Sequence, residues 1–412
     1  MNIPDVIIIL KWWVVLFLIG ISFFPFTYKI FNNFIDKGYI FSKILGLLFI
    51  SYSIFVLSSF KLLTFSTINL IIIWTTLFAV QLLILRKQKY ELRKHLKIFI
   101  FEEFLFLIAL IAWSYVRSFS PSIHGLEKFM DFGFINSILR TEYLPPRDMW
   151  LTPFSINYYY FGHLFTAVLT KLSQIPSFIT FNLMIASLFA FTFTMSFSIG
   201  ITLVKSIKNF SIKKSFVFGL FFAFFLSLAG NLQTVYSFFK SYAGSETAPP
   251  FWDLIFLPQN FPNSYWYPNA TRFIYNTIHE FPSYSFVVAD LHGHVLNIPV
   301  VLTIIALLFS IFISKKISVL TITLVGFLLS VSYMTNAWDG LIYFGLSIFI
   351  IFFFSVLSNK SPLKEKMIKS VFSTFKYTTF LFLLFFSFTF VFNRNFTPFA
   401  SEIGINCAPD FL

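Results

Sequence analysis

The sequence predicts an all-α polytopic membrane protein with about ten transmembrane helices and one re-entrant or half-inserted helix. Of its 412 residues, 57% are hydrophobic and only 11% are charged, and the mean hydropathy is +0.80. A soluble domain of this length could not bury so much apolar surface. Helices are the expected spanning form, because backbone groups inside a bilayer must be satisfied within each segment.

Apolar runs long enough to cross a bilayer, which takes about 20 residues at helical rise, occur along the whole chain. They cover residues 6–26, 39–60, 62–85, 97–117, 178–204, 215–235, 286–314, 317–335, 340–358 and 370–392. A weaker run covers 156–175. The first run has no small-residue cleavage site, so we expect it to remain as an anchor. The single cysteine, Cys407, excludes an intrachain disulfide framework and a cysteine-cluster metal site.

Clusters of basic residues predict the orientation of these runs. The clusters lie at 86–97, 205–214, 315–316 and 360–369. All four are cytoplasmic only if 156–175 does not cross completely, so we expect ten complete spans and a half-inserted helix there. The loops 118–155, 236–285 and 336–339 and the tail after 392 then share the outer face. The net charge of +13 therefore indicates topology and not a nucleic-acid partner.

The first outer loop contains two acidic residues at helical spacing. Glu127 and Asp131 are four residues apart and would share one face of a helix, where their like charges repel slightly. Either they form a solvated face, or they are a catalytic carboxylate site, as a general base or a metal ligand. Leu144–Pro146 ends any helix, and Arg147 and Asp148 follow it as candidate substrate-binding residues.

The stretch NYYYFGH at 157–163 places three tyrosines where the chain returns to the membrane. A phenol suits the lipid headgroup layer, so one interpretation is an aromatic belt. On a helix, however, three successive tyrosines cannot all face one way, so at least one must point toward protein. The second interpretation is therefore substrate binding by Asn157, Tyr158, Tyr159, Tyr160 and His163.

The second outer loop ends in an Asp-x-His-x-His pattern. Asp290 and His294 would share a face of a helix, whereas Asp290, His292 and His294 would all share one side of an extended segment. Such a triplet can bind Zn²⁺ or another divalent ion, so the three residues are a candidate metal site and a divalent metal ion is a candidate cofactor. Glu280, shortly before, is a candidate contributor to the same pocket.

Two further outer residues are candidate substrate contacts. Asp339 lies in NAWDG between two spans, where it could equally be a turn residue. Arg394 follows the last span as an outer-face cation that could meet a phosphate. The chain contains no GxxxxGK, GxGxxG, GxSxG or HExxH, so P-loop, Rossmann, serine-hydrolase and zincin chemistry all lack their signatures.

Several blocks of the sequence resemble the YYY-type membrane proteins, an uncharacterised family named for its tyrosine triplet. In order, they are GLEKFMDFGFINSILRTEYLPPRDMW with NYYYFGH, GNLQ, TIHEFPSYSFVVADLHGH, TNAWD and NFTPFASEIGI, over roughly residues 117–406. The chain has DLHGH, NAWD and PPRDMW where the family usually has Asp-Leu-His-Pro-His, Asn-Ser-Trp-Asp and Pro-Pro-x-Asp-Pro-Trp.

That family is grouped with the GT-C glycosyltransferases, polytopic enzymes that use lipid-phosphate sugars as donors. The resemblance implies a GT-C-like fold, with N-terminal transmembrane helices at 1–96 and a YYY-type membrane domain at 97–412. It implies that Asp131 or Glu127 is the catalytic carboxylate and that Pro145–Pro146 form the turn after it. The implied donor is a polyprenyl-phosphate-linked sugar at the extracytoplasmic face of the cell membrane.

Two other functions fit the same residues. In a lipid or glycolipid transporter or flippase, the acidic and aromatic side chains would bind without doing chemistry. In a metal-dependent membrane hydrolase, DLHGH would be the centre. The expected partners are membrane lipids and the lipid-linked sugar donor, without nucleic acid; nothing in the sequence indicates the oligomeric state.

Overall fold

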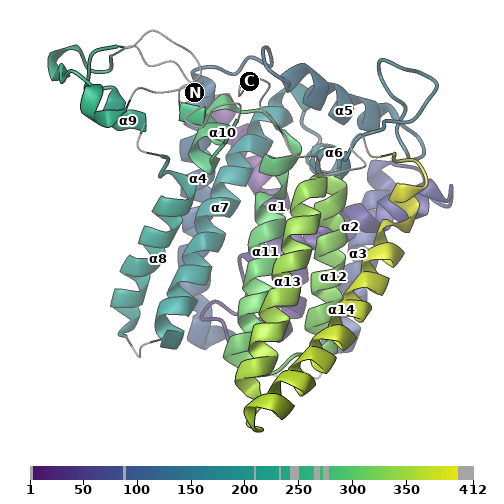
Figure 1. The fold of residues 1–412 in the computed structure, drawn as a ribbon. Helices are drawn as coiled ribbons and strands as arrows, with labels where there is room; N and C mark the ends of the chain where they lie inside the picture. Colours follow the sequence, from purple (N-terminus) through teal and green to yellow (C-terminus); the bar gives the residue numbers. More distant parts are fainter. Residues whose placement is uncertain are drawn as a thin grey trace, which may run out of the picture.

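The computed structural model describes residues 3–86, 90–207, 210–231, 233–241, 250–263, 270–271 and 278–397. In these residues the chain forms helices joined by loops, and β structure is limited to two isolated bridges. Long helices run side by side as a bundle, and the short helices gather at one of its ends (Figure 1). The prediction of an all-α protein is confirmed for the described part of the chain.

The long helices coincide with the apolar runs of the sequence. They are α1 (Ile3–Ile30), α2 (Phe41–Ser59), α3 (Thr67–Leu85), α4 (Leu92–Ser118), α7 (Ser177–Ile207), α8 (Ile212–Ser227), α11 (Gly293–Ser314), α12 (Val319–Thr335), α13 (Ala337–Ser358) and α14 (Leu363–Asn393). In the described residues, six of them are long and apolar enough to cross a membrane, namely α1, α2, α7, α11, α13 and α14. The prediction of a multi-pass membrane protein is confirmed.

Two helices are shorter than the runs that predicted them. The run at 215–235 continues apolar, but α8 ends at Ser227. The run at 286–314 yields a helix only from Gly293, because the preceding residues form the separate short helix α10 (Pro282–Val288). Ala289 ends α10 in the left-handed conformation, with φ of 63°. This break leaves the DLHGH stretch as a turn at the start of α11.

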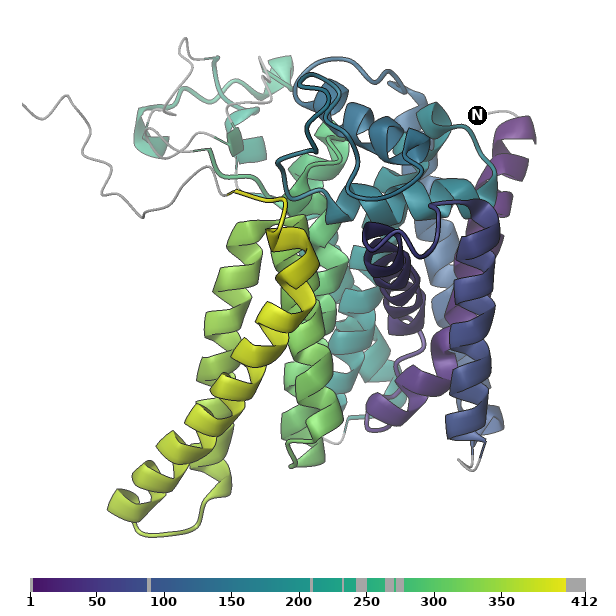
Figure 2. The ribbon, with the colours of Figure 1, turned by 90° about the vertical axis from the view of Figure 1, so that its right-hand side faces the viewer.

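The short elements lie in or next to the loops 118–155 and 236–285, except for α6, which covers the weak apolar run. They are α5 (Lys128–Arg140), α6 (Phe161–Ser173), α9 (Gln233–Tyr236), α10 and the 3₁₀ turns η1 (Phe251–Asp253) and η2 (Pro258–Asn260). Figures 1 and 2 show α5, α6 and α10 at one end of the bundle, while the basic segments between the long helices lie at the other end. The chemistry-capable loops therefore share one end, as expected.

Helix α6 covers the weak apolar run at 156–175. Its 13 residues span about 20 Å, which is less than the roughly 30 Å of a bilayer core. It contacts α1, α2, α3, α5, α7, α11 and α12, and in Figures 1 and 2 it lies across the end of the bundle. The chain therefore enters and leaves α6 at the same end of the bundle.

One hydrophobic core holds these elements together. It extends from Ile9 in α1 to Phe392 in α14, and the fully buried Phe161 and Phe165 of α6 belong to it. The helices before and after residue 97 thus share this core, and a second, smaller cluster consists of Tyr39, Ile98, Phe99, Phe197, Ile201 and Ala223. Because α6 is buried from both sides, the loop that precedes it is fixed against the ends of α11 and α12.

Candidate functional site

On helix α5 the side chain of Asp131 points into the protein interior. Asp131, Phe134, Ile135 and Ile138 are buried at the i, i+3, i+4, i+7 spacing of one helical face. Glu127 precedes the helix as its N-cap residue and is exposed, with 58% of its side chain accessible. The two carboxylates lie on one face, as their spacing predicted, but at different depths. The solvated-face interpretation is wrong for Asp131, which is completely buried.

Asp131 is paired with His163. The Oδ1 atom of Asp131 lies 3.0 Å from Nε2 of His163, and both side chains are 0% exposed. The ring of Phe134 packs edge-on against the imidazole. The other polar atoms of the pair, Asp131 Oδ2 and His163 Nδ1, have no hydrogen-bond partner among the described residues. This buried pair joins α5 to α6 beneath the site.

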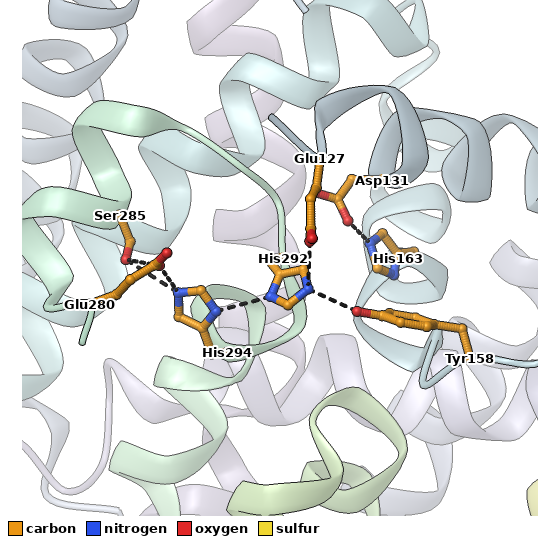
Figure 3. A network of polar contacts seen from close by, with 8 residues as sticks. All are labelled: Glu127, Asp131, Tyr158, His163, Glu280, Ser285, His292 and His294. Carbon is orange, nitrogen blue, oxygen red and sulfur yellow. Dashed lines mark hydrogen bonds and ion pairs between the residues drawn. The ribbon is translucent and has the colours of Figure 1, made fainter. Parts of the chain in front are cut away.

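A continuous chain of polar contacts runs beside this pair (Figure 3). Glu127 Oε2 lies 2.9 Å from His292 Nε2, and the Tyr158 hydroxyl lies 2.8 Å from the same nitrogen. The Nδ1 atoms of His292 and His294 are 3.1 Å apart. His294 Nε2 then lies 2.8 Å from Glu280 Oε2. Two imidazoles are thus lined up between two carboxylates that come from different loops.

Hydrogen-bond donors can be counted along this chain. The contact between the two Nδ1 atoms requires a proton on one of them, and the contact with Glu280 requires an N–H at His294 Nε2. Two neutral histidines carry these two protons, and His292 Nε2 then accepts from the Tyr158 hydroxyl. A third proton, on His292 Nε2 facing Glu127, would give the pair one positive charge, and the burial of His292 opposes it.

Four residues of this chain of contacts, Glu127, Glu280, His292 and His294, line one cavity of about 820 Å³. It receives Glu127 from the first outer loop, Glu280 and Asp290 from the second, and Asp339 from the start of α13. The histidine pair also faces it. The structure thus brings the 118–163 region and DLHGH to a shared cavity, although they are more than 120 residues apart.

Asp290 is the most perturbed acid of this cavity. Burial raises its pKa from 3.8 to about 7, and the negative charges of Asp131 and Glu127 act in the same direction. The ammonium group of Lys128 opposes them. Asp290 Oδ1 has no hydrogen-bond partner among the described residues. At neutral pH this carboxyl is therefore poised between its neutral and its charged form.

The other shifts follow from the same contacts. Burial lowers the pKa of His292, and the charge of Asp131 opposes that change. The hydrogen bond from His294 lowers the pKa of Glu280, which keeps that carboxylate ionised. Ser285 donates to Glu280 at 3.2 Å and holds it in place. The site therefore combines fixed negative charge with imidazoles that can exchange protons.

The tyrosine triplet divides between the site and the core. Tyr158 reaches His292 and packs on Tyr159, whose ring centroid is 4.0 Å away. Tyr159 also lies against Gly293, where an added Cβ would come within 3.1 Å of its ring. Tyr160 is 3% exposed and belongs to the core. Two phenols therefore serve the site and one serves packing.

Asp339 lines the cavity as a fixed acceptor. Its Oδ2 atom accepts hydrogen bonds from the side-chain amides of Asn297 and Asn336, each at 2.9 Å. These bonds tie the starts of α11 and α13 together below the histidine pair. Asp339 is thus held by neighbours on both sides and is more than a turn residue.

The remaining sequence candidates lie away from this cavity. Asn157 accepts a hydrogen bond from the Thr397 backbone amide. Asp148 accepts from two backbone amides in the turn that follows it, which is a local structural role. Arg147 lines a separate surface cavity of about 780 Å³, and Arg394 is exposed just beyond α14. None of the four lines the cavity of the histidine pair. For Arg147 and Asp148 the reason is that the loop at 146–156 folds back on itself.

The expected metal ligands are not gathered around one point. In the described part of the chain, no group of three His, Cys, Asp or Glu side chains is placed to hold a metal ion. The reason is the direction of the imidazoles: His292 and His294 turn Nδ1 toward each other and Nε2 toward carboxylates. Asp290, His292 and His294 therefore do not fit a metal ion as they stand.

Two site residues were missed by reasoning from the sequence. Lys128 is buried beside Glu127, three residues before Asp131 on the same helical face, and its charge acts on Asp290. A lysine in an interfacial helix usually serves the lipid headgroups, but this spacing could have indicated an inward position. Ser285, which holds Glu280 and His294, gave no signal in the sequence.

Comparison with known proteins gives a family without an assigned activity. A family model described as an uncharacterized membrane protein (DUF2298) matches residues 49–410. No curated protein and no solved structure matches the chain. The family match begins inside α2 and so includes most of the helices that bear the site.

Proposed function

The chain belongs to this family of uncharacterised membrane proteins, and we propose that it is an integral-membrane glycosyltransferase of the GT-C type with ten complete spans. Its donor would be a polyprenyl-phosphate-linked sugar, and it would act at the extracytoplasmic face. The observation that carries the proposal is the cavity of about 820 Å³ in which carboxylates from two outer loops surround an imidazole pair. Cavities that bind small molecules combine such a concave shape with a few converging polar groups.

Glu127 is the general base of the proposed reaction. Its carboxylate accepts the proton of the acceptor hydroxyl while that oxygen forms a bond to the anomeric carbon. The bond from the anomeric carbon to the phosphate oxygen breaks, and its electron pair leaves with the polyprenyl phosphate. Glu127 is preferred over Asp131 because it lines the cavity, whereas Asp131 is buried against His163.

In this proposal the histidine pair and Lys128 lie toward the leaving phosphate. Charge develops on the phosphate oxygen as the sugar departs, and a preorganised cation stabilises that change. Buried Lys128 supplies such a charge, and a proton taken up by His292 and His294 would add a second. This assignment replaces Arg147 and Arg394, which face elsewhere.

Two tyrosines and an exit toward the bilayer complete the proposed site. Tyr158 and Tyr159 form a stacked surface next to His292, and aromatic faces of this kind suit the apolar face of a sugar ring. Ile342 of α13 lines the cavity and is 60% exposed, on a helix that is long and apolar enough to cross the membrane. The isoprenoid tail would leave the cavity past this residue into the bilayer.

The test uses the full chain in liposomes with radiolabelled polyprenyl-phosphate sugars. Glu127→Gln should reduce release of polyprenyl phosphate by about 100-fold or more while donor binding is retained, because only the proton acceptor is lost. Glu142→Gln is the matched control, since Glu142 is an exposed carboxylate at the same end that lines a different cavity. It should turn over at the wild-type rate.

Two results would count against the proposal. Wild-type turnover by Glu127→Gln would remove Glu127 as the base. Donor that moves between leaflets without cleavage, equally in both variants, would favour the flippase alternative, in which these residues only bind.

A further inference from the structure

A second polar cavity lies at the opposite end of the bundle. It has a volume of about 370 Å³ and is enclosed by the α11–α12 loop, the end of α13 and the beginning of α14. In Figure 2 the α13–α14 pair leans away from the other helices toward this end. Three lysines line the cavity, Lys315, Lys316 and Lys369, and none of its lining residues is acidic.

Two of these lysines carry uncompensated charge. The side chains of Lys315 and Lys316 are exposed and have no hydrogen-bond or ion-pair partner among the described residues. Lys369 differs, because Glu365 lies 2.5 Å from its ammonium group. The cavity therefore presents two adjacent free cations at its rim.

A buried hydroxyl faces the same cavity. Ser370 lines it and is 1% exposed, yet its Oγ has no hydrogen-bond partner among the described residues. Two other hydroxyls of α14 bond to the carbonyl four residues earlier, Thr374 to Ser370 and Thr389 to Phe385, both at 2.8 Å. The Thr378 hydroxyl is unpaired among the described residues like that of Ser370, but only Ser370 of these two lines the cavity. An unpaired buried hydroxyl is unfavourable, so the position of Ser370 indicates a ligand that accepts its proton.

The surroundings indicate a lipid as the source of that ligand. Phe372 and Phe375 follow the cavity along α14 and are each 70% exposed, facing outward where acyl chains would lie. Tyr377 lines the cavity with an amphipathic ring suited to the headgroup layer. Basic pockets between helices on the cytoplasmic side are typical headgroup sites.

We propose that this cavity binds the phosphate of an anionic phospholipid in the cytoplasmic leaflet. Lys315 and Lys316 supply the positive charge, and Ser370 donates a hydrogen bond to a phosphate oxygen. The acyl chains lie along the exposed phenylalanines of α14. The site is independent of the outer cavity and of the activity proposed for it.

The experiment measures binding of phosphatidylglycerol and of phosphatidylcholine to the purified full chain by native mass spectrometry. Phosphatidylglycerol should bind more tightly, and Lys315→Ala with Lys316→Ala should weaken it about fivefold for each lysine. Lys213→Ala with Lys214→Ala is the matched control, an exposed adjacent pair in the first turn of α8 at the same end. It should leave the affinity unchanged.

Ser370→Ala distinguishes a specific phosphate site from nonspecific attraction of anionic lipid to basic loops. It removes no charge and should weaken phosphatidylglycerol binding about tenfold, because a hydrogen bond to a charged oxygen is lost. The proposal is overturned if this variant binds like the wild type, if the two lysine pairs weaken binding equally, or if inorganic phosphate displaces the lipid. In that last outcome the ligand is free phosphate.

Discussion

Replacement of Asp131 by alanine tests how much the buried pair of Asp131 and His163, which joins α5 to α6, contributes to stability. Its carboxylate lies 3.0 Å from His163, and neither side chain is exposed. Loss of one partner leaves the other buried without compensation, which costs about 3–5 kcal/mol. The exposed contact between Glu127 and His292 provides the comparison, because 58% of the Glu127 side chain is accessible and such pairs contribute below about 1 kcal/mol.

The measurement is a pair of double-mutant cycles on the full chain. Free energies of unfolding in bicelles, obtained with increasing sodium dodecyl sulfate, give the coupling energy of each pair from its two single alanine variants and the double variant. The coupling energy of Asp131 and His163 should be several times that of Glu127 and His292. Asp131→Asn should recover part of the loss, because its amide oxygen still accepts a hydrogen bond from His163 Nε2.

Activity then separates the two carboxylates. If Asp131 positions α5 and Glu127 is the base, Asp131→Asn keeps measurable transfer, whereas Glu127→Gln loses transfer without loss of stability. Equal coupling energies in the two cycles would refute the reasoning from burial. An inactive but fully stable Asp131→Asn variant would move the catalytic role to Asp131.

Raising the pH from about 4 to about 7 should lower the free energy of unfolding through Asp290. In the folded chain the pKa of Asp290 is about 7, above its ordinary 3.8. The stability that its proton contributes is complete below about pH 4 and is lost as the proton leaves near pH 7. Asp290→Asn should flatten this part of the curve of unfolding free energy against pH, and an unchanged slope would contradict it. Gly293→Ala places a Cβ 2.4 Å from a backbone carbonyl oxygen of α12 and should cost about 1–3 kcal/mol in thermal unfolding, whereas Gly345→Ala, with open space around it, should not. In a cysteine-free background, a cysteine at Ser211 should react with impermeant reagents only from the cytoplasmic side and one at Asn263 only from outside; labelling of position 211 from outside would reverse the orientation.

The sequence could predict which loops meet but not which side chains face the cavity. Apolar runs and basic clusters were sufficient to bring the first and second outer loops to one end. Helical spacing gave Glu127 and Asp131 a common face. Their depth depends on His163, which only tertiary packing brings beneath Asp131.

The positively charged residues show the same limit of prediction from the sequence. Arg147 follows the proline turn and was the more visible candidate, but the 146–156 loop folds on itself, with the Ile156 amide bonded to the Pro146 carbonyl. Lys128 looked like an ordinary interfacial residue and is instead buried near Asp290. Side-chain direction in such loops is decided by contacts across the fold, which spacing along one element does not contain.

The tyrosine triplet shows why the starting points of two helices control the site. On a helix, Tyr158 and Tyr159 would point about 100° apart, but α6 begins only at Phe161, after the triplet. The two phenols precede the helix and stack with centroids 4.0 Å apart. On the other side α11 begins at Gly293, whose missing side chain admits the Tyr159 ring. If either helix began a turn earlier, this arrangement of Tyr158 against His292 would be lost, so the geometry of the histidine pair depends on both breaks.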